Sequence, residues 1–213
     1  DTLYLHVFDW PKDGRLVVGG LKSAVKSAWL LSDASRTPLK VTRLNPLDVS
    51  LDVPGATPDK ADSVIALQCV GDIAVDTARL LQPAFGCETL RVFDAELRGK
   101  ELRFGAGKTR DAYVTGWTSK DASIVWSVRL NQTVTCDVGV IYDAAPASAG
   151  GRFDVSFGSD VLSGAVKAGT MQTASVGRVT LEPGHVEIKL IAEAITGKEV
   201  MRPRALTLRR VDP

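Results

Sequence analysis

Residues 3–16 read LYLHVFDWPKDGRL, and this stretch indicates the fold class. Its first six side chains point alternately to two sides of an extended chain, as in a β-strand. One side is aliphatic and the other is aromatic: Leu3, Leu5 and Val7 against Tyr4, His6 and Phe8. Trp10 precedes a proline and is therefore restricted to an extended conformation, and Asp13-Gly14 is a strong turn signal. The stretch predicts two strands joined by a turn.

The same period of two recurs along the chain. Turns that contain Gly, Pro or Asp separate the segments every dozen residues or so, and no helical period extends over a useful length. The predicted strands lie within residues 23–32, 39–44, 49–53, 62–70, 93–97, 124–130, 153–157 and 186–190. Short, evenly spaced strands are typical of β-sandwiches. We therefore predict an all-β protein with two jelly-roll-like β-sandwich domains in tandem.

A change of pattern marks a domain boundary. Residues 76–86 have no clear period, whereas a new series of strands begins at Phe93. We predict a first sandwich over residues 1–72, a linker over 73–92 and a second sandwich over 93–213. The first domain is small enough to need a neighbouring surface for stability.

The composition excludes some classes of partner. The 213 residues carry 26 Lys and Arg against 25 Asp and Glu, a formal net charge of +1, which gives no reason to expect nucleic acid. No apolar run has the length of a membrane span. Residue 1 is followed at once by a predicted strand, so we expect any targeting segment to lie upstream or to have been removed.

The three cysteines predict neither a disulfide framework nor a metal site. Cys69 and Cys136 lie in register with apolar residues and are expected to be buried, whereas Cys87 is expected in an accessible loop. Two histidines and no nucleophile elbow argue against a Ser-His-Asp site. Asp111, Asp121 and Asp143 all lie in turn-like sequence, where solvated carboxylates are expected. We therefore predict that this chain alone has no hydrolytic activity.

The first third of the chain resembles a known family. Residues 3–16, followed by Gly20-Leu21, AWLL at 28–31 and PLKV at 38–41, form an ordered series of motifs similar to the C-terminal β-sandwich of α-L-fucosidases of glycoside hydrolase family 29. In that family the sandwich follows a (β/α)₈-like catalytic barrel. The resemblance implies a secreted or periplasmic parent enzyme and a barrel as partner. His6 is then expected to serve packing or hydrogen bonding at the interdomain face.

The rest of the chain resembles family 6 and family 35 carbohydrate-binding modules. The motifs are FDAE at 93–96, DAYVTGWT at 111–118, DASIVWSV at 121–128, YDA at 142–144, FDV at 153–155 and GRVTLEPG at 177–184. Such modules are jelly rolls that bind sugars through aromatic side chains at one loop end, often with structural calcium. Glu96 fits the position of an early calcium ligand, but one carboxylate does not supply the six to eight oxygens that calcium takes. We expect no cofactor, with structural calcium as the less favoured alternative.

The aromatic residues separate by register. Trp126 and Tyr142 align with the apolar positions of their strands and are expected in the core. Trp117 lies in a turn sequence close to Tyr113, where a flat ring is able to stack on a sugar. The alternative for Trp117 is a side chain folded back to close the end of the sandwich.

Arg202 and Arg204 complete the predicted carbohydrate-binding site with Tyr113 and Trp117, because related modules contribute sugar contacts from this segment. If all four side chains meet, the arginines favour an acidic or sulfated fucose-containing glycan. The alternative is that the arginines pair with carboxylates on neighbouring strands. The candidate carboxylates are Asp94, Glu96 and Glu101.

Two functions remain open from the sequence. The first is a non-catalytic C-terminal region of an α-L-fucosidase-like hydrolase, which supports the catalytic barrel and binds a fucose-containing glycan. The second is a pair of structural sandwiches with no ligand of their own. An independent enzyme on a β-sandwich is the least favoured.

Overall fold

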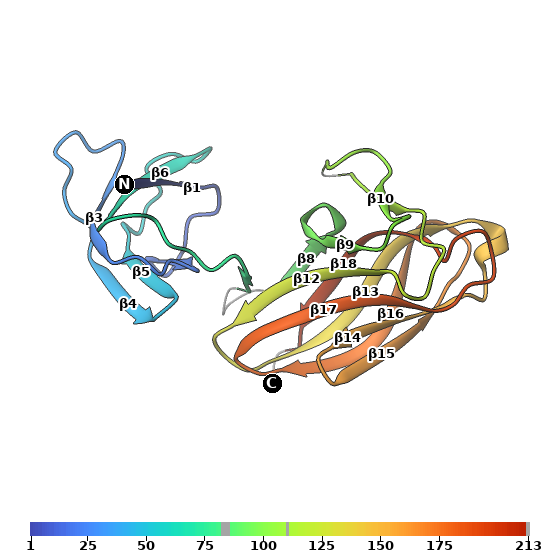
Figure 1. Cartoon of the computed structure of the whole chain (residues 1–213). Helices are drawn as coiled ribbons and strands as arrows, with labels where there is room; N and C mark the ends of the chain where they lie inside the picture. The colour runs from blue at the N-terminus through green and yellow to red at the C-terminus, as the bar shows by residue number, and fades with distance from the viewer. Residues whose placement is uncertain (82–85, 110, 212–213) are drawn as a thin grey trace. The chain divides into compact units, whose positions relative to one another are not determined.

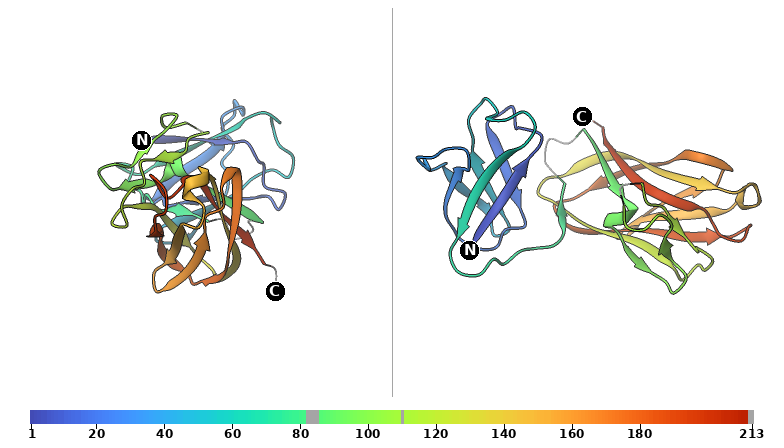
Figure 2. Two further views of the ribbon diagram at one scale, coloured as in Figure 1. Left: turned by 90° about the vertical axis from the view of Figure 1, so that its right-hand side faces the viewer. Right: turned by 90° about the horizontal axis from the view of Figure 1, so that it is seen from above.

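The computed structural model describes residues 1–81, 86–109 and 111–211. The chain divides into two compact units, Asp1–Arg79 and Leu80–Pro213. Both are built of antiparallel strands, which can be followed in Figures 1 and 2. The described residues form two short 3-10 helices, η1 (Val92–Asp94) and η2 (Pro146–Ser148), and no α-helix, which confirms the all-β prediction. No described helix is long and apolar enough to cross a bilayer.

The first unit contains two three-stranded sheets with strand orders β1-β6-β3 and β2-β5-β4. The strands are β1 (Thr2–Val7), β2 (Arg15–Gly19), β3 (Val25–Leu30), β4 (Val41–Asn45), β5 (Asp48–Asp52) and β6 (Ser63–Cys69). Its core draws on both sheets and includes Val7, Ala28, Val49, Leu51, Ile65 and Leu67. The strand predicted over residues 23–32 is confirmed as β3.

The opening stretch carries the chain from one sheet of the first unit to the other. Gly14 closes the turn with a positive φ of 71°, and its N–H donates to the carbonyl of Pro11 at 3.2 Å. The Trp10 indole N–H donates to the carbonyl of Pro54 at 2.7 Å. Because β1 and β2 belong to different sheets, this turn joins the two layers of the sandwich.

The second unit contains a larger pair of sheets, with orders β15-β14-β17-β12-β7 and β16-β13-β18-β8; β9 also pairs with β12, and β10 pairs with β11. The strands are β7 (Arg79–Leu80), β8 (Cys87–Arg91), β9 (Glu96–Arg98), β10 (Arg103–Phe104), β11 (Val114–Thr115), β12 (Ser123–Leu130), β13 (Val134–Ala144), β14 (Arg152–Phe157), β15 (Asp160–Ala165), β16 (Gly169–Leu181), β17 (Gly184–Ala194) and β18 (Arg202–Arg210).

The break between the units, after Arg79, falls inside the segment that we interpreted as a linker. Part of that segment is strand rather than linker, because β8 pairs with β18 of the second unit. Residues 82–85 of the same segment lie outside the described part of the chain.

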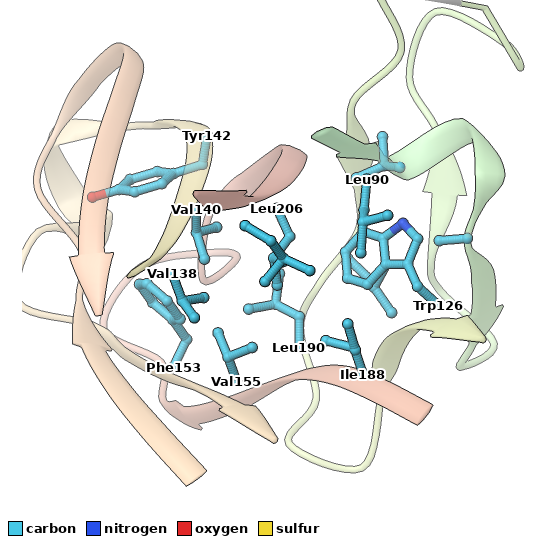
Figure 3. Close-up of a cluster of buried hydrophobic side chains, with 14 of the residues drawn as sticks. Leu90, Trp126, Val138, Val140, Tyr142, Phe153, Val155, Ile188, Leu190 and Leu206 are labelled. Atoms are coloured by element: carbon cyan, nitrogen blue, oxygen red, sulfur yellow. The ribbon is translucent and has the colours of Figure 1, made fainter. Parts of the chain in front are cut away.

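The core of the second unit contains the two aromatic residues that the sequence placed there. Trp126 is 3% exposed and Tyr142 is 1% exposed, and Figure 3 shows both among the aliphatic side chains of the core. The Trp126 indole N–H donates to the carbonyl of Arg91 at 2.9 Å, and the Tyr142 hydroxyl accepts from the N–H of Lys167 at 2.9 Å. The polar groups of both rings therefore have partners, as burial requires.

The cysteines follow the prediction with one correction. Cys69 and Cys136 are buried, and Cys87 is exposed. Cys87 begins strand β8, however, and does not lie in a loop. Burial raises the pKa of the Cys136 thiol to about 11, so this side chain stays a neutral thiol at physiological pH.

Candidate functional site

Three of the four predicted site residues meet at one end of the second unit. Tyr113 directly precedes β11, whereas Arg202 and Arg204 lie at the start of β18. The guanidinium carbons of Arg202 and Arg204 lie 5.7 and 5.3 Å from the centroid of the Tyr113 ring. These distances are within the range of a cation–π contact. We call Tyr113, Arg202, Arg204, Asp143 and Glu199 the tyrosine cluster.

Arg204 is fixed by a carboxylate on the neighbouring strand. Its Nε and Nη2 atoms donate to Oδ2 of Asp143 at 2.8 and 2.6 Å, and its Nη1 donates to the carbonyl of Asp111 at 3.1 Å. The side chains of Arg204 and Asp143 are 27% and 18% exposed. Charge-assisted hydrogen bonds at such burial hold the guanidinium in one orientation.

Asp143 corrects an expectation, because it lies on β13 and not in a solvated turn. Burial raises the pKa of its carboxyl group, but hydrogen bonds from Arg204 and from the N–H of Met171 lower it, and the net pKa is below the ordinary value. Asp143 is therefore ionised at neutral pH. Its Oδ1 accepts from the N–H of Met171 at 2.7 Å, so each carboxylate oxygen has its own partner.

Arg202 is fixed by a second carboxylate. Its Nε donates to Oε1 of Glu199 at 2.6 Å, and this bond raises the pKa of Arg202 further above its already high value. The other oxygen of Glu199 accepts from the Thr115 hydroxyl at 3.1 Å and from the N–H of Gly116 at 3.0 Å. Glu199 thus ties the start of β18 to the turn after β11.

Trp117 does not belong to this surface. Its side chain is 0% exposed, and its indole N–H donates to the carbonyl of Ala122 at 3.3 Å. The turn before it is tightly closed: Gly116 has a φ of 78°, and a Cβ there would lie 2.1 Å from the carbonyl oxygen of Glu101. The prediction that Trp117 stacks on a sugar is wrong in this structure. The alternative prediction, a side chain folded back into the sandwich, agrees with its burial.

The Tyr113 ring is covered in part by backbone. A Cβ built on Gly105 would lie 2.1 Å from a ring carbon of Tyr113, so only glycine fits there. The Gly105 N–H also donates to the Tyr113 carbonyl at 2.8 Å. The ring is half-buried, whereas the Arg202 side chain is 49% exposed. A ligand at this end therefore meets the Arg202 guanidinium and the uncovered part of the ring.

The charges of the tyrosine cluster balance. Two guanidinium groups face two carboxylates, those of Asp143 and Glu199. The alternative prediction of arginine–carboxylate pairing therefore holds, but with different partners. Of the carboxylates expected as partners, Glu96 pairs with Arg98 at 2.8 Å and Glu101 with Arg103 at 3.6 Å.

Sequence reasoning missed Asp143 and Glu199 as site residues. Register would have found Asp143, because Val138, Val140 and Tyr142 point inward and the next residue must point outward. Glu199 lies outside any strand, and no pattern in the sequence marks it.

The described residues contain no group of three or more His, Cys, Asp or Glu side chains placed to hold a metal ion. Glu96, the residue that fits the early calcium-ligand position, is instead hydrogen-bonded to Arg98, which lowers the pKa of its carboxyl group despite the opposing effect of burial. The geometry therefore gives Glu96 a role in an ion pair.

The first unit carries an exposed aromatic surface on β1 and the residue directly after it. Tyr4 and Phe8 are 58% and 74% exposed. Between them, Nδ1 of His6 lies 2.7 Å from Oδ2 of Asp62, and the His6 ring stacks on Phe8 with centroids 6.3 Å apart. His6 therefore packs and hydrogen-bonds, as the sequence predicted.

Comparison with known proteins gives structural neighbours but no sequence relative: no family model and no curated protein matches the chain. An α-L-fucosidase from Vibrio sp. strain EJY3 is similar with a TM-score of 0.56 and 13% identity, over 98% of this chain and 38% of that one. The mosquito-larvicidal Cry4Aa toxin of Bacillus thuringiensis gives a TM-score of 0.51 and 10% identity, over 88% of this chain and 30% of the toxin. A family 35 carbohydrate-binding module from Clostridium thermocellum gives a TM-score of 0.47 and 16% identity, over 57% of this chain and 96% of the module.

The α-L-fucosidase among these neighbours is an enzyme of the kind that the first third of the sequence resembles. At such identities the similarity shows the fold alone. The chain spans less than half the length of the fucosidase and of the toxin.

Proposed function

We propose that this chain is a non-catalytic, glycan-binding region of a secreted α-L-fucosidase-like glycoside hydrolase. The observation that carries the proposal is the tyrosine cluster, in which an aromatic ring and two guanidinium groups are held in fixed positions at one end of a jelly roll. Sugar-binding sites combine an aromatic surface with a few well-placed polar groups. The cluster offers both kinds of group.

The side chains of the cluster are positioned before a ligand arrives. Asp143 holds Arg204, and Glu199 holds Arg202. Because these side chains are already ordered, a ligand does not have to immobilise them, and this lowers the entropic cost of binding. The exposed guanidinium of Arg202 supplies planar N–H donors to sugar hydroxyl groups.

The balanced charges indicate a neutral ligand. An acidic or sulfated glycan was expected only if Trp117 joined the other three residues, and Trp117 is buried. Each arginine already has a carboxylate partner, so an anionic ligand would have to compete with Asp143 or Glu199. We propose a neutral, fucose-containing glycan.

Titration of the full chain with neutral and sulfated fuco-oligosaccharides tests the glycan proposal. We expect the wild type to bind the neutral series, and Tyr113→Ala to bind about tenfold or more weakly. Arg178→Ala is the matched control, because Arg178 also pairs with a carboxylate, Asp137, but lies away from the cluster on β16. Binding lost equally in the control, or absent in the wild type, rejects the site.

For the first unit we propose a supporting role against the catalytic barrel of the parent enzyme. Tyr4 and His6 of β1, with Phe8 directly after it, supply an exposed aromatic surface for the contact. The chain itself is expected to leave aryl fucosides unhydrolysed. Turnover by a preparation free of full-length enzyme would contradict this.

The second candidate function is a purely structural one for both units. It is favoured by the pairing of both arginines with carboxylates, which gives the cluster a complete set of internal partners. The same titration separates the two functions, because a structural cluster binds none of the oligosaccharides.

A further inference from the structure

The two guanidinium groups of the tyrosine cluster differ in how open they are to a ligand. Arg204 donates from Nε and Nη2 to Asp143 and from Nη1 to the carbonyl of Asp111, and its side chain is 27% exposed. Arg202 is 49% exposed, and within the described part of the chain its side chain makes one hydrogen bond, from Nε to Glu199. The two Nη groups of Arg202 are therefore the N–H donors that the cluster offers to a ligand.

The carboxylate that pairs with Arg202 is fixed on both of its oxygens. Oε1 of Glu199 accepts from Arg202, and Oε2 accepts from the Thr115 hydroxyl at 3.1 Å and from the N–H of Gly116 at 3.0 Å. The backbone carbonyl of Glu199 accepts from the Ser148 hydroxyl at 2.7 Å, and the Glu199 side chain is 16% exposed. Because these bonds come from three different segments of the second unit, the carboxylate stays beside the guanidinium when a ligand arrives.

We propose that Glu199 is a specificity-determining residue of this site, whose carboxylate makes the cluster select neutral glycans and reject anionic ones such as sulfate esters and uronic acids. The inference rests on the proposed function and names the residue that sets its specificity. An anion at the Nη groups of Arg202 is attracted by the guanidinium and repelled by the carboxylate bound to the same group, so the two effects oppose each other. A sugar hydroxyl accepts the same N–H bonds without this repulsion.

Asp143 does not have the same role. It also pairs with an arginine, but all three nitrogens of that arginine, Arg204, already donate within the protein. An anion therefore finds no donor left on Arg204, whatever the charge of Asp143. The choice between neutral and anionic ligands is made at Arg202 and Glu199.

The test compares a neutral fuco-oligosaccharide with the same oligosaccharide carrying a sulfate ester, each titrated calorimetrically into the full chain. Glu199→Gln removes the charge but keeps the length of the side chain and an oxygen for the Thr115 hydroxyl and the Gly116 N–H. Glu199→Asp keeps the charge. Thermal unfolding of each variant is measured first, to show that it is folded at the temperature of the titration.

We expect the wild type to bind the sulfated form about tenfold more weakly than the neutral form. Glu199→Gln should bind the sulfated form about tenfold more tightly than the wild type does, and high salt should remove this gain. Glu199→Asp should still reject the sulfated form. Adding Arg202→Gln to Glu199→Gln should abolish the gain, which assigns it to this guanidinium.

Asp160→Asn is the control for net charge. Asp160 is exposed at the start of β15, which belongs to the other sheet of the second unit from β18. The substitution changes the charge of the chain by the same amount as Glu199→Gln. We expect it to leave the affinity for both oligosaccharides unchanged.

Three results overturn the inference. They are equal affinity of the wild type for the neutral and sulfated forms, no gain in a folded Glu199→Gln variant, and an equal gain in Asp160→Asn. The first needs no variant, so it decides even when a substitution prevents folding. In each case, binding of the neutral form by the wild type leaves the proposed function in place. Conversely, no binding of the neutral form, together with a gain for the sulfated form in Glu199→Gln, rejects the proposed function and supports the role of Glu199.

Discussion

The two units use their large apolar side chains in opposite ways. In the second unit the largest buried side chains are the aromatic residues Trp117, Tyr142 and Phe153. In the first unit no aromatic side chain is fully buried, and most of the exposed large apolar residues of the described chain lie there: Tyr4, Phe8, Leu31, Leu44, Val70, Ile73 and Val75, against Val161 and Met171 in the second unit.

The difference follows from size. A sandwich of two three-stranded sheets encloses little volume, and its core consists of aliphatic side chains. Small domains bury a smaller fraction of their surface and are correspondingly less stable. The second unit is stable through its own core, whereas the first unit is expected to gain stability from a partner surface over β1.

The largest effect is expected from truncating a buried ring of the second unit. Trp117→Ala should lower the free energy of unfolding of that unit by about 3–5 kcal/mol, because it leaves a large cavity. In the first unit, Trp29 is half-buried and is covered by the Arg36 guanidinium at 5.5 Å, so Trp29→Ala should cost about 1 kcal/mol. Urea unfolding followed by NMR signals of each unit measures both. Equal costs would contradict the contrast between the units.

Two glycines with similar φ values give the next effect. Gly116 and Gly71 have φ of 78° and 67°, but a Cβ at Gly116 would lie 2.1 Å from a backbone oxygen, whereas nothing lies within 4 Å at Gly71. Gly116→Ala should lower the free energy of unfolding by about 2 kcal/mol or more. Gly71→Ala should lower it by about 1 kcal/mol, from backbone strain alone. Thermal unfolding of the two variants provides the measurement. A smaller loss for Gly116→Ala would show that its turn adapts.

A third prediction concerns the exposed face of β1. Without the barrel, the exposed aromatic face is expected to support weak self-association of the chain at high concentration. Tyr4→Ser with Phe8→Ser should weaken this association severalfold and change the free energy of unfolding by about 0.5 kcal/mol or less, since both side chains are largely in solvent. Sedimentation at several concentrations measures the association. Val161→Thr, a change of an exposed apolar residue on the second unit, is the control and should have no effect on association.

The smallest expected effect is the loss of stability of the second unit at low pH. Hydrogen bonds from Arg98 and then from Lys189 lower the pKa of Glu187 from 4.5 to about 2, against the opposing effect of burial. A folded-state pKa below the unfolded value gives stability that is present above about pH 4.5 and is lost as the pH falls to about 2. Because the pair is 39–40% exposed, the contribution should be below about 1 kcal/mol.

Glu187→Gln should reduce the pH dependence of the free energy of unfolding in the second unit alone. In the first unit, hydrogen bonds from Thr37 and Ser35 lower the pKa of Asp33. Asp33→Asn should therefore reduce the loss of stability at low pH in that unit alone. Unfolding measured between pH 2 and pH 5 separates the two. An identical response of both units to either substitution would contradict this.

For the candidate site, the sequence suggested residue types but not the orientation or the partner of each side chain. Tyr113, Arg202 and Arg204 lie close together in the structure, and their role in binding stays a prediction. Trp117 was left between two interpretations, because a turn sequence does not show whether its ring points inward or outward. Asp143 was assigned to a turn, although the alternation along β13 extends to it.

The sequence by itself determined the all-β class and the core positions of Trp126 and Tyr142. These features depend on alternation and turn residues, which act over a few positions. Only the tertiary structure decided the partners of Arg202 and Arg204, the burial of Trp117 and the left-handed conformation of Met171. Each of these depends on strand register and on contacts between residues far apart in the chain, and register is set by the packing of the whole sandwich.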